Sequence, residues 1–380
     1  MLQTTVWLGI AVVVLAYSAD YSSPMWWREL FLYTSAAISI GGIFLFRQYE
    51  DWPMVLRALG IMSLAIIVLG LVRGNPAQSL LGYPTGHPGA LAIAASIMIA
   101  LFLVDSTNWK LGNIFVFTAG YTLLSMFTFS GGRLMGLVTQ ANVSALISAI
   151  GYIVGLRLFI LWPKYRWQIL VLEIVLLAGV ILTQSRLVIL AIISATAISV
   201  FLSAREEKSA KAKTNILLLV IGVLVLIVIM VFFVPRFVNF QYLIESIHYR
   251  LDLWLYSLRM LVHAQPLGLG SGSIALHLID FGQPPPRMMS TIANNYYFES
   301  SHNILIDRGI EWGLVGLATY LTIIIASLRS VLANWSKNLI EINIIVLMII
   351  VFVLINNSVI ELEMIFWLFL IRLIYPKPFY

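Results

Sequence analysis

Long apolar stretches, separated by short polar clusters, run along almost the whole chain. A helix that crosses a membrane needs about 20 mostly apolar residues, and the stretches predict about twelve such helices. Their cores are Thr5–Tyr17, Leu30–Phe46, Met54–Val72, Gly89–Val104, Leu111–Phe129, Val143–Trp162, Ile169–Leu182, Leu187–Leu202, Ile216–Val234, Ile304–Leu328, Ile342–Ile355 and Leu362–Ile374. The pattern predicts an all-α, polytopic membrane protein in which residues 1–380 form a single integral membrane domain.

Composition supports this class and excludes others. The 380 residues are 61% hydrophobic and only 11% charged, which argues against a large soluble domain. The net charge of +6 is modest, so we expect no nucleic-acid partner. The absence of cysteine excludes disulfides, thiolate catalysis and cysteine-bound metals. The apolar stretch Val6–Tyr17 follows no basic segment and is interpreted as the first span rather than a cleaved signal.

Lysine and arginine separate by side when the spans are laid out. With an even number of spans and both termini in the cytoplasm, every lysine falls on the cytoplasmic side, at positions 110, 164, 208, 211, 213, 337 and 377. The far side carries only arginine: Arg28, Arg73, Arg133, Arg186, Arg236, Arg250, Arg259, Arg287 and Arg308. A planar guanidinium suits phosphate groups. These arginines are therefore phosphate-binding candidates, and anchoring at the membrane interface is the alternative for each.

Two segments on the far side are irregular. One is the tight connection Thr183-Gln184-Ser185-Arg186, in which Ser185 is predicted to cap the next helix and Arg186 to begin it. A helix N-terminus attracts anions, so an arginine there adds to an anion site. An ordinary hairpin with an arginine that reaches the interface is the alternative.

The other irregular segment is 235–301, the long non-cytoplasmic loop, which begins with an amphipathic helix. Its apolar stripe is Phe237, Phe240, Ile244, Ile247, Leu251, Trp254 and Leu258. The predicted opposite side carries Glu245, His248, Asp252 and Arg259. Arg250 lies on the flank of the stripe, one turn from Trp254, where it faces lipid headgroups or a pocket. The glycines at 268, 270 and 272 allow close backbone approach to a ligand.

The segment Ser301–Gly316 leads into the tenth predicted span. A helical wheel places one group of residues on a common face: His302, Ile306, Gly309, Gly313 and Gly316. His302 is thus predicted to stand at the membrane boundary, above a groove of glycines. Arg308 and Glu311 lie elsewhere, at the i, i+3 spacing of an ion pair. A histidine can take a proton from a hydroxyl near neutral pH. A histidine that only makes structural hydrogen bonds is the alternative interpretation.

Several of these motifs, in their shared order, resemble the bacterial O-antigen ligase and O-antigen polymerase family. The motifs are His302-Asn303 with Leu305/Ile306, Glu311, Gly313 and Gly316; Gly132–Gly136 with Gln140-Ala141-Asn142; the Ser185-Arg186 hairpin; and Arg250 with Trp254, Pro266-Leu267-Gly268 and Gly270. The family's usual Asn-Pro-Asn stands here as Gln-Ala-Asn.

The resemblance implies an inverting, metal-independent glycosyltransferase without a cofactor. It implies transfer of a glycan from undecaprenyl pyrophosphate at the periplasmic face of the bacterial inner membrane. Carried onto this chain, Arg186 and Arg250 bind the donor pyrophosphate, and His302 deprotonates the acceptor hydroxyl. The second-rank candidates are Arg133, Asn303, Trp254, Glu311 and Arg287, with Glu173 added because a charge inside a span is costly. Glu361 and Glu363 are interpreted as interfacial charges, with help in acceptor binding as the alternative.

Three choices stay open. The acceptor is lipid A–core for a ligase, which we favour, and a second lipid-linked glycan for a polymerase. A carrier or flippase of lipid-linked sugars is the main alternative of another class, although the charges gather at one face and no internal repeat is visible. A purely structural scaffold does not need far-side arginines. Membrane lipids are expected partners in every case.

Overall fold

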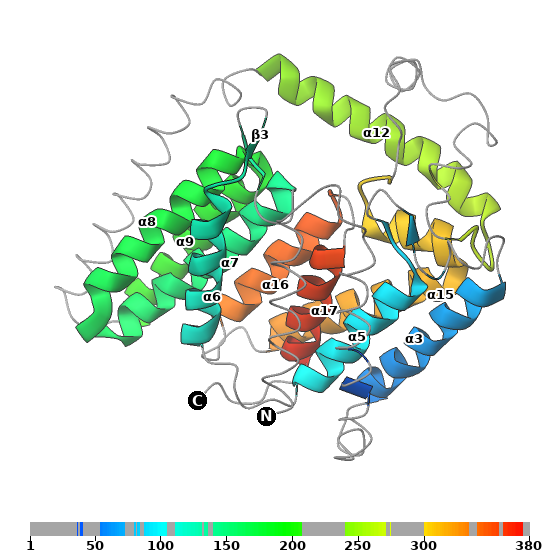
Figure 1. Ribbon diagram of the computed structural model, residues 1–380, viewed down its shortest axis with the longest axis horizontal. Helices are drawn as coiled ribbons and strands as arrows, with labels where there is room; N and C mark the ends of the chain where they lie inside the picture. Colours follow the sequence, from blue (N-terminus) through cyan, green and yellow to red (C-terminus); the bar gives the residue numbers. More distant parts are fainter. Residues whose placement is uncertain are drawn as a thin grey trace. The chain divides into compact units, whose positions relative to one another are not determined.

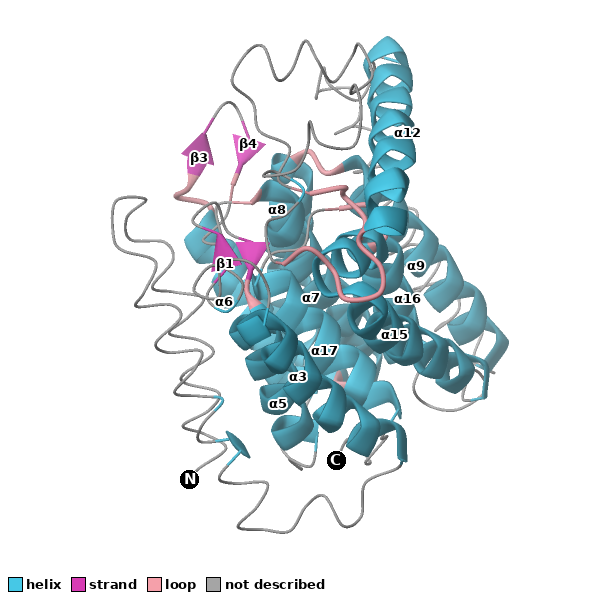
Figure 2. Ribbon diagram, turned by 90° about the vertical axis from the view of Figure 1, so that its right-hand side faces the viewer, coloured by secondary structure: helices cyan, strands magenta, loops and turns pink. Residues whose placement is uncertain are grey.

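A computed structural model describes residues 36, 39–40, 54–72, 80, 82–83, 87–104, 111–130, 133–135, 140–206, 240–270, 274, 300–333, 340–356 and 360–374. The predicted spans Thr5–Tyr17 and Ile216–Val234, and nearly all of Leu30–Phe46, lie outside these residues. In the described part, helices dominate, and the strands form two short antiparallel pairs (Figure 2). The predicted all-α class is therefore confirmed for this part of the chain.

The chain divides into two compact units. The first comprises residues 1–107, 244–333 and 349–378. It contains α3 (Met54–Val72), α5 (Ala90–Val104), most of α12 (Phe240–His263), α15 (Ile304–Ala333), α17 (Ile360–Ile374) and the pair β1 (Gly82–Tyr83) and β2 (His87–Pro88). Helix α5 packs against α3 and α17, and α15 packs against the same two helices (Figure 1). Four helices thus form the core of this unit.

The second unit comprises residues 108–243, 334–348 and 379–380. It contains α6 (Leu111–Ser125), β3 (Phe129–Ser130), β4 (Arg133–Leu134), α7 (Ala141–Leu161), the short 3-10 helix η2 (Pro163–Tyr165), α8 (Arg166–Thr183) and α9 (Arg186–Glu206). Helix α7 packs against α6, α8 and α9 and is the most central. Helix α16 (Ile340–Val353) crosses the division between the two units.

Hydroxyl groups and glycines let the helices of the second unit approach closely. Tyr121 Oη and Ser144 Oγ are 2.8 Å apart, and so are Thr122 Oγ1 and Ser148 Oγ, so each pair joins α6 to α7. Gly151 of α7 has no room for a Cβ atom beside Thr118 of α6. Small and hydroxyl residues at helix contacts are typical of membrane helices.

Four described helices are long and apolar enough to cross a membrane: Met54–Val72, Ala141–Leu161, Pro163–Thr183 (η2 with α8) and Ile304–Ala333. Shorter apolar helices occupy Ala90–Leu101, Leu111–Ser125, Arg186–Ala197, Ile342–Val353 and Ile365–Ile374. Each coincides with a predicted span. The fifth predicted span is shorter than expected, because α6 ends at Ser125 and is followed by a turn and the β3–β4 pair.

Candidate active site

His302 lies in a tight turn directly before α15, and side chains hold the backbone of this turn. His302 is half-buried and has a φ of 58°, in the left-handed region that non-glycine residues seldom adopt. Its backbone N–H donates to Ser300 Oγ at 2.9 Å. The neighbouring Ser301 N–H donates to the buried Asp307 at Oδ1, at 2.7 Å. Side-chain oxygens therefore hold the backbone N–H groups of both Ser301 and His302, and the imidazole projects from this fixed backbone.

Asn303 is the N-terminal cap of α15. Its Oδ1 accepts the backbone N–H groups of Leu305 at 3.0 Å and Ile306 at 3.3 Å. Its own N–H donates to Ser301 Oγ at 3.2 Å, and that hydroxyl donates to the Asn303 carbonyl at 3.1 Å. A cap of this kind satisfies N–H groups that have no partner within the helix. Asn303 thus positions the first turn of α15 next to His302.

Helix α15 is not continuous. Gly313 has φ 58° and ψ −144°, which separates a half-helix, Ile304–Trp312, from the longer segment Leu314–Ala333. The predicted common face of His302 with the three glycines is therefore wrong, because His302 precedes the helix and Gly313 interrupts it. The space beside Gly309 is filled by the Leu261 side chain of α12. Gly313 likewise lies against Pro266, and Gly316 lies against the Arg308 backbone of the half-helix, so the glycines serve packing contacts rather than the predicted groove.

The segment 265–270, which follows α12, binds along the interruption in α15. Three backbone hydrogen bonds join them: Leu314 N–H to the Pro266 carbonyl (2.9 Å), Leu269 N–H to Ile310 (2.8 Å) and Gly270 N–H to Glu311 (3.0 Å). Gly268 has φ +80°, and a Cβ atom there would overlap the backbone of Glu311. The sequence predicted that the backbone at Gly268 closely approaches a ligand. In the structure, it closely approaches the half-helix.

Helix α12 packs onto the half-helix. Leu253, Tyr256 and Met260 of α12 form a buried cluster with Ile306 and Ile310 of α15. Trp254, half-buried, packs against the same cluster. The helix that carries Trp254 and the half-helix that follows His302 therefore belong to one packed substructure.

Arg250 lies one turn before Trp254 on α12 and is half-buried. Burial lowers the pKa of its guanidinium from the usual value. A cation in such a partly desolvated place attracts an anion more strongly than a fully hydrated one does. Arg250 is therefore not fully hydrated, and its contact with lipid headgroups or a pocket stays a prediction.

The faces of α12 differ from the predicted pattern. The stripe residues Ile244, Ile247, Leu251 and Leu258 are exposed, and Leu255 and Val262 extend the exposed apolar surface. The packed face is the one with Leu253 and Met260, where the prediction placed polar residues. The polar residues Glu245, His248, Asp252 and Arg259 instead flank the exposed stripe. The prediction failed because α12 is apolar on two faces, and only one of them was recognised.

A buried ionic cluster joins α15 to α17 in the same unit. Arg308 is fully buried and donates to Glu363 Oε1 from Nε at 3.2 Å and from Nη2 at 2.8 Å, and Nη1 pairs with Glu311. Glu363 Oε2 accepts hydrogen bonds from Tyr320 Oη and, at 3.0 Å, from Trp367 Nε1. Both oxygens of Glu363 are therefore satisfied by side chains of these two helices.

This cluster changes three interpretations from the sequence. The i, i+3 pairing of Arg308 with Glu311 is confirmed. Arg308, counted among the possible phosphate ligands, is bound to two carboxylates instead. Glu363, interpreted as an interfacial charge, is fully buried. Tyr320 was missed because it lies 43 residues from Glu363 in the chain. Trp367 lies one helical turn after Glu363, but a tryptophan in an apolar span gave no reason to pair it with the acid.

In the second unit, the tight connection between α8 and α9 leads into a helix that begins at Arg186, as predicted, whereas the cap by Ser185 stays a prediction. Helix α8 ends at Thr183, Gln184 adopts the left-handed conformation of a C-cap, and α9 begins at Arg186. Arg133 of β4 donates from Nε to the Thr183 carbonyl at 2.9 Å. Arg133 thus holds the last residue of the helix before the hairpin. Arg186 itself is half-buried at the first position of its helix.

The predicted site residues are divided between the two units. Arg250, Trp254, His302, Asn303 and Glu311 belong to the first unit, whereas Arg133 and Arg186 belong to the second. Arg287 and the side chain of Glu361 lie outside the described residues. Among the residues that are described, no group of three or more His, Cys, Asp or Glu side chains could hold a metal ion.

The described helices are those of a multi-pass membrane protein. Residues 170–321 match the family model of O-antigen ligase, and the family resemblance seen in the motifs is confirmed over these residues. The matched segment contains Arg186, Arg250, Trp254, His302 and Glu311, whereas Arg133 and Glu363 lie outside it. A search of the curated proteins found no match to this chain.

Proposed function

We propose that the protein is an inverting, metal-independent glycosyltransferase that moves a glycan from undecaprenyl pyrophosphate to an acceptor hydroxyl. The observation that carries the proposal is the turn at His302. It presents a histidine at the head of a half-helix, packed against the helix of Arg250, within the segment that matches the O-antigen ligase model. Lipopolysaccharide assembly, with lipid A–core as the acceptor, is the favoured process, in keeping with the description of the matched family.

In the proposed reaction, His302 takes the proton of the acceptor hydroxyl as its oxygen attacks the anomeric carbon. The bond between that carbon and the pyrophosphate oxygen breaks, and undecaprenyl pyrophosphate leaves with the bonding electrons. Attack from the face opposite the leaving group inverts the anomeric configuration. Arg250, and Arg186 from the second unit, stabilise the negative charge that grows on the leaving pyrophosphate. The proposal therefore requires Arg186 to reach the same donor.

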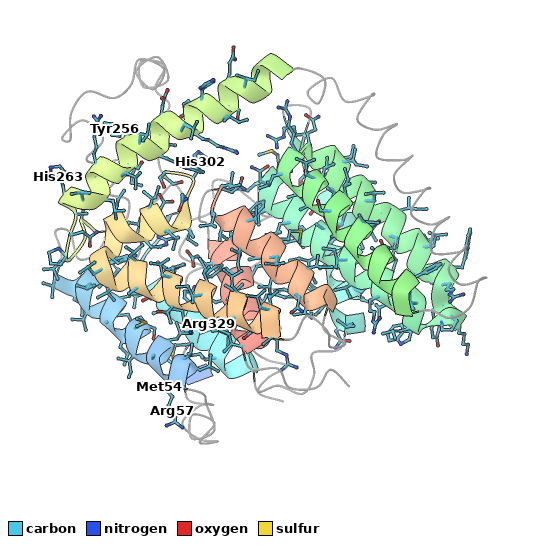
Figure 3. The ribbon with its side chains drawn as sticks, turned by 180° about the vertical axis from the view of Figure 1, so that it is seen from behind. Met54, Arg57, Tyr256, His263, His302 and Arg329 are labelled. Carbon is cyan, nitrogen blue, oxygen red and sulfur yellow. The ribbon has the colours of Figure 1, made fainter. Side chains whose placement is uncertain are left out.

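We further propose about twelve spans in one integral membrane domain, in the bacterial inner membrane, with both termini cytoplasmic. The site and the loop 235–301 would then face the periplasm. Within the first unit, His302 lies toward one end, near α12, whereas Arg57 and Arg329 lie toward the other end (Figure 3). This separation supports the proposed sides, because the span order assigns Arg57 and Arg329 to the cytoplasmic ends of their helices.

The test is transfer by the purified protein in lipid nanodiscs, offered an undecaprenyl-pyrophosphate glycan and each acceptor in turn. We expect His302→Ala to lower turnover by about 10²–10⁴-fold and Arg250→Ala by about 10²–10³-fold. Arg329→Ala, an exposed arginine at the other end of α15, is the matched control and should keep normal turnover. Wild-type turnover in the His302→Ala variant contradicts the proposed catalytic role.

The acceptor that yields product distinguishes a ligase from a polymerase. Movement of the lipid-linked glycan across the membrane, without a new glycosidic bond, favours a carrier instead. Arg186→Lys should be nearly as harmful as Arg186→Ala, since an ammonium cannot reproduce the guanidinium fork. EDTA should leave turnover unchanged, and a loss that magnesium restores contradicts a metal-independent reaction.

A further inference from the structure

His302 adopts a backbone conformation that a histidine does not hold unaided. The left-handed region brings the Cβ atom close to the following carbonyl oxygen, so surrounding contacts must maintain it. Two hydrogen bonds act on the peptide groups beside it: the N–H of His302 donates to Ser300 Oγ, and the N–H of Ser301 donates to Asp307 Oδ1. The second is the shorter of the two, and its acceptor is a carboxylate.

Asp307 is placed to do this by the half-helix. It lies in the first turn of α15, and its backbone N–H donates to the Asn303 carbonyl at 2.9 Å, as a helical residue there does. The Asn303 cap fixes this first turn. The backbone of Asp307 is therefore fixed by the helix. Its side chain points back past the Asn303 cap and accepts the N–H of Ser301, the residue before His302.

The other buried acids near this end of α15 are engaged elsewhere. Glu311 and Glu363 pair with Arg308. Asp307 is the acid whose oxygen bonds to the turn of His302, and it is almost completely buried. Asp307 accepts the Ser301 N–H and also hydrogen-bonds to the side chains of Ser301 and Ser300, and Ser300 Oγ in turn accepts the N–H of His302. The carboxylate therefore fixes the chain immediately before His302.

We propose that Asp307 is a positioning residue for catalysis: through the Ser301 peptide it holds His302 in the left-handed conformation that aims the imidazole at the acceptor hydroxyl. The inference rests on the proposed glycosyl transfer and adds to it a residue that touches no substrate. Asp307 does not exchange a proton with the reactants.

The test compares Asp307→Ala with Asp307→Asn in the nanodisc transfer assay. The alanine removes the acceptor and should lower kcat by about 10²-fold, as expected for a misplaced catalytic group. The KM for the lipid-linked donor should stay within about twofold, because donor binding involves other residues. The asparagine retains an oxygen that can accept the Ser301 N–H, so we expect it to keep most of the activity.

Two further readouts separate positioning from a merely structural role. Hydrogen exchange at the Ser301 amide should be faster in Asp307→Ala and close to normal in Asp307→Asn. Ser327→Ala, which deletes another buried polar group of α15, should leave kcat and that exchange unchanged. If folded Asp307→Ala protein turns over at the wild-type rate, the inference is overturned.

A second variant covers the case in which Asp307→Ala does not fold. Replacing Ser301 by its α-hydroxy analogue exchanges the donated N–H for an ester oxygen and leaves Asp307 in place. We expect a comparable loss of kcat, and wild-type turnover overturns the inference. Absence of transfer by the wild-type protein contradicts the proposed function instead. Transfer that requires His302 but is indifferent to Asp307 and to the Ser301 N–H rejects the positioning role alone.

Discussion

Two buried glutamates show how differently the two units treat an acid within an apolar helix. Glu363 of α17 is fully buried and accepts hydrogen bonds at both oxygens from Arg308, Tyr320 and Trp367. Glu173 of α8 is also buried, at 7% exposure, but neither of its oxygens has a hydrogen-bond partner among the described residues. It occupies space beside Gly155 of α7, where a Cβ atom would overlap its carboxyl group.

Burial of an acid therefore does not by itself reveal what the acid does. Glu363 connects two helices through directional bonds, so its removal takes one of two carboxylate partners from Arg308 and the hydrogen-bond acceptor from Tyr320 and Trp367. Glu173 has no hydrogen-bond partner among the described residues, so a neutral side chain of the same shape can replace it without breaking such a bond. The same residue type is therefore expected to be structurally essential in the first unit and nearly replaceable in the second.

Arg308→Ala should have the largest effect. It leaves Glu311 and Glu363 buried without their cation, and breaking a buried ion pair from one side costs about 3–5 kcal/mol. The free energy of unfolding, measured by denaturant titration in detergent, checks this value. Arg329→Ala, on the same helix but exposed, should change stability by less than about 0.5 kcal/mol. Equal effects of the two variants contradict a structural role for the cluster.

Gly313→Ala should come next, because it acts on the helix break rather than on the charges. The positive φ of Gly313 strains any other residue, and an added Cβ atom would overlap the Pro266 carbonyl. We expect a loss of about 2–4 kcal/mol. Gly60→Ala in α3 meets no atom within 4 Å and should be neutral or slightly stabilising. The midpoint of thermal unfolding distinguishes them, and a neutral Gly313→Ala indicates that α15 tolerates a continuous helix.

Tyr320→Phe and Tyr121→Phe each remove one buried hydroxyl, the first from the first unit and the second from the second unit, and their effects on stability should differ. Tyr320 donates to the carboxylate of Glu363, whereas Tyr121 shares a hydrogen bond with the neutral hydroxyl of Ser144. A hydrogen bond to a charged group contributes about 1.5–3 kcal/mol, and a neutral one contributes about 1 kcal/mol. Unfolding free energies should therefore fall more for Tyr320→Phe. The reverse order is evidence against an ionised Glu363.

Glu173→Gln should have the smallest effect. The amide is close in shape to the carboxyl group and is neutral, which suits a position where no described residue donates to the acid. We expect the free energy of unfolding to change by less than about 1 kcal/mol. Glu363→Gln, measured in parallel, should be clearly more harmful, because the amide puts donors where Glu363 only accepts. A large loss for Glu173→Gln reveals a partner for this acid and removes the contrast.

The helices could be predicted from the sequence, because each described span is an uninterrupted apolar stretch between polar clusters. The start of α9 at Arg186 was predictable for a similar reason, since a serine precedes it after a tight turn. These features depend only on neighbours along the chain, which a sequence displays directly.

The parts of the site that failed depend on distant contacts. Glu363 pairs with an arginine 55 residues away, and no periodicity relates the two. The break at Gly313 is stabilised by Pro266 from another segment, so a helical wheel drawn through it is misleading. The packed face of α12 was missed because the helix carries a second apolar face, and the sequence does not show which of the two is buried. Asp307 was overlooked because one acid in a first helical turn is common.

The docking of segment 265–270 on the half-helix has a practical consequence for chimeras. Arg250 lies on α12 and His302 lies directly before α15, and segment 265–270 connects these two helices. Exchanging only one of the helices with that of a relative would therefore disrupt the contacts between them. Swaps designed to alter acceptor choice should transplant residues 240–316 as one cassette. A chimera junction at Ala264 or Ser300 would disrupt hydrogen bonds that position these segments.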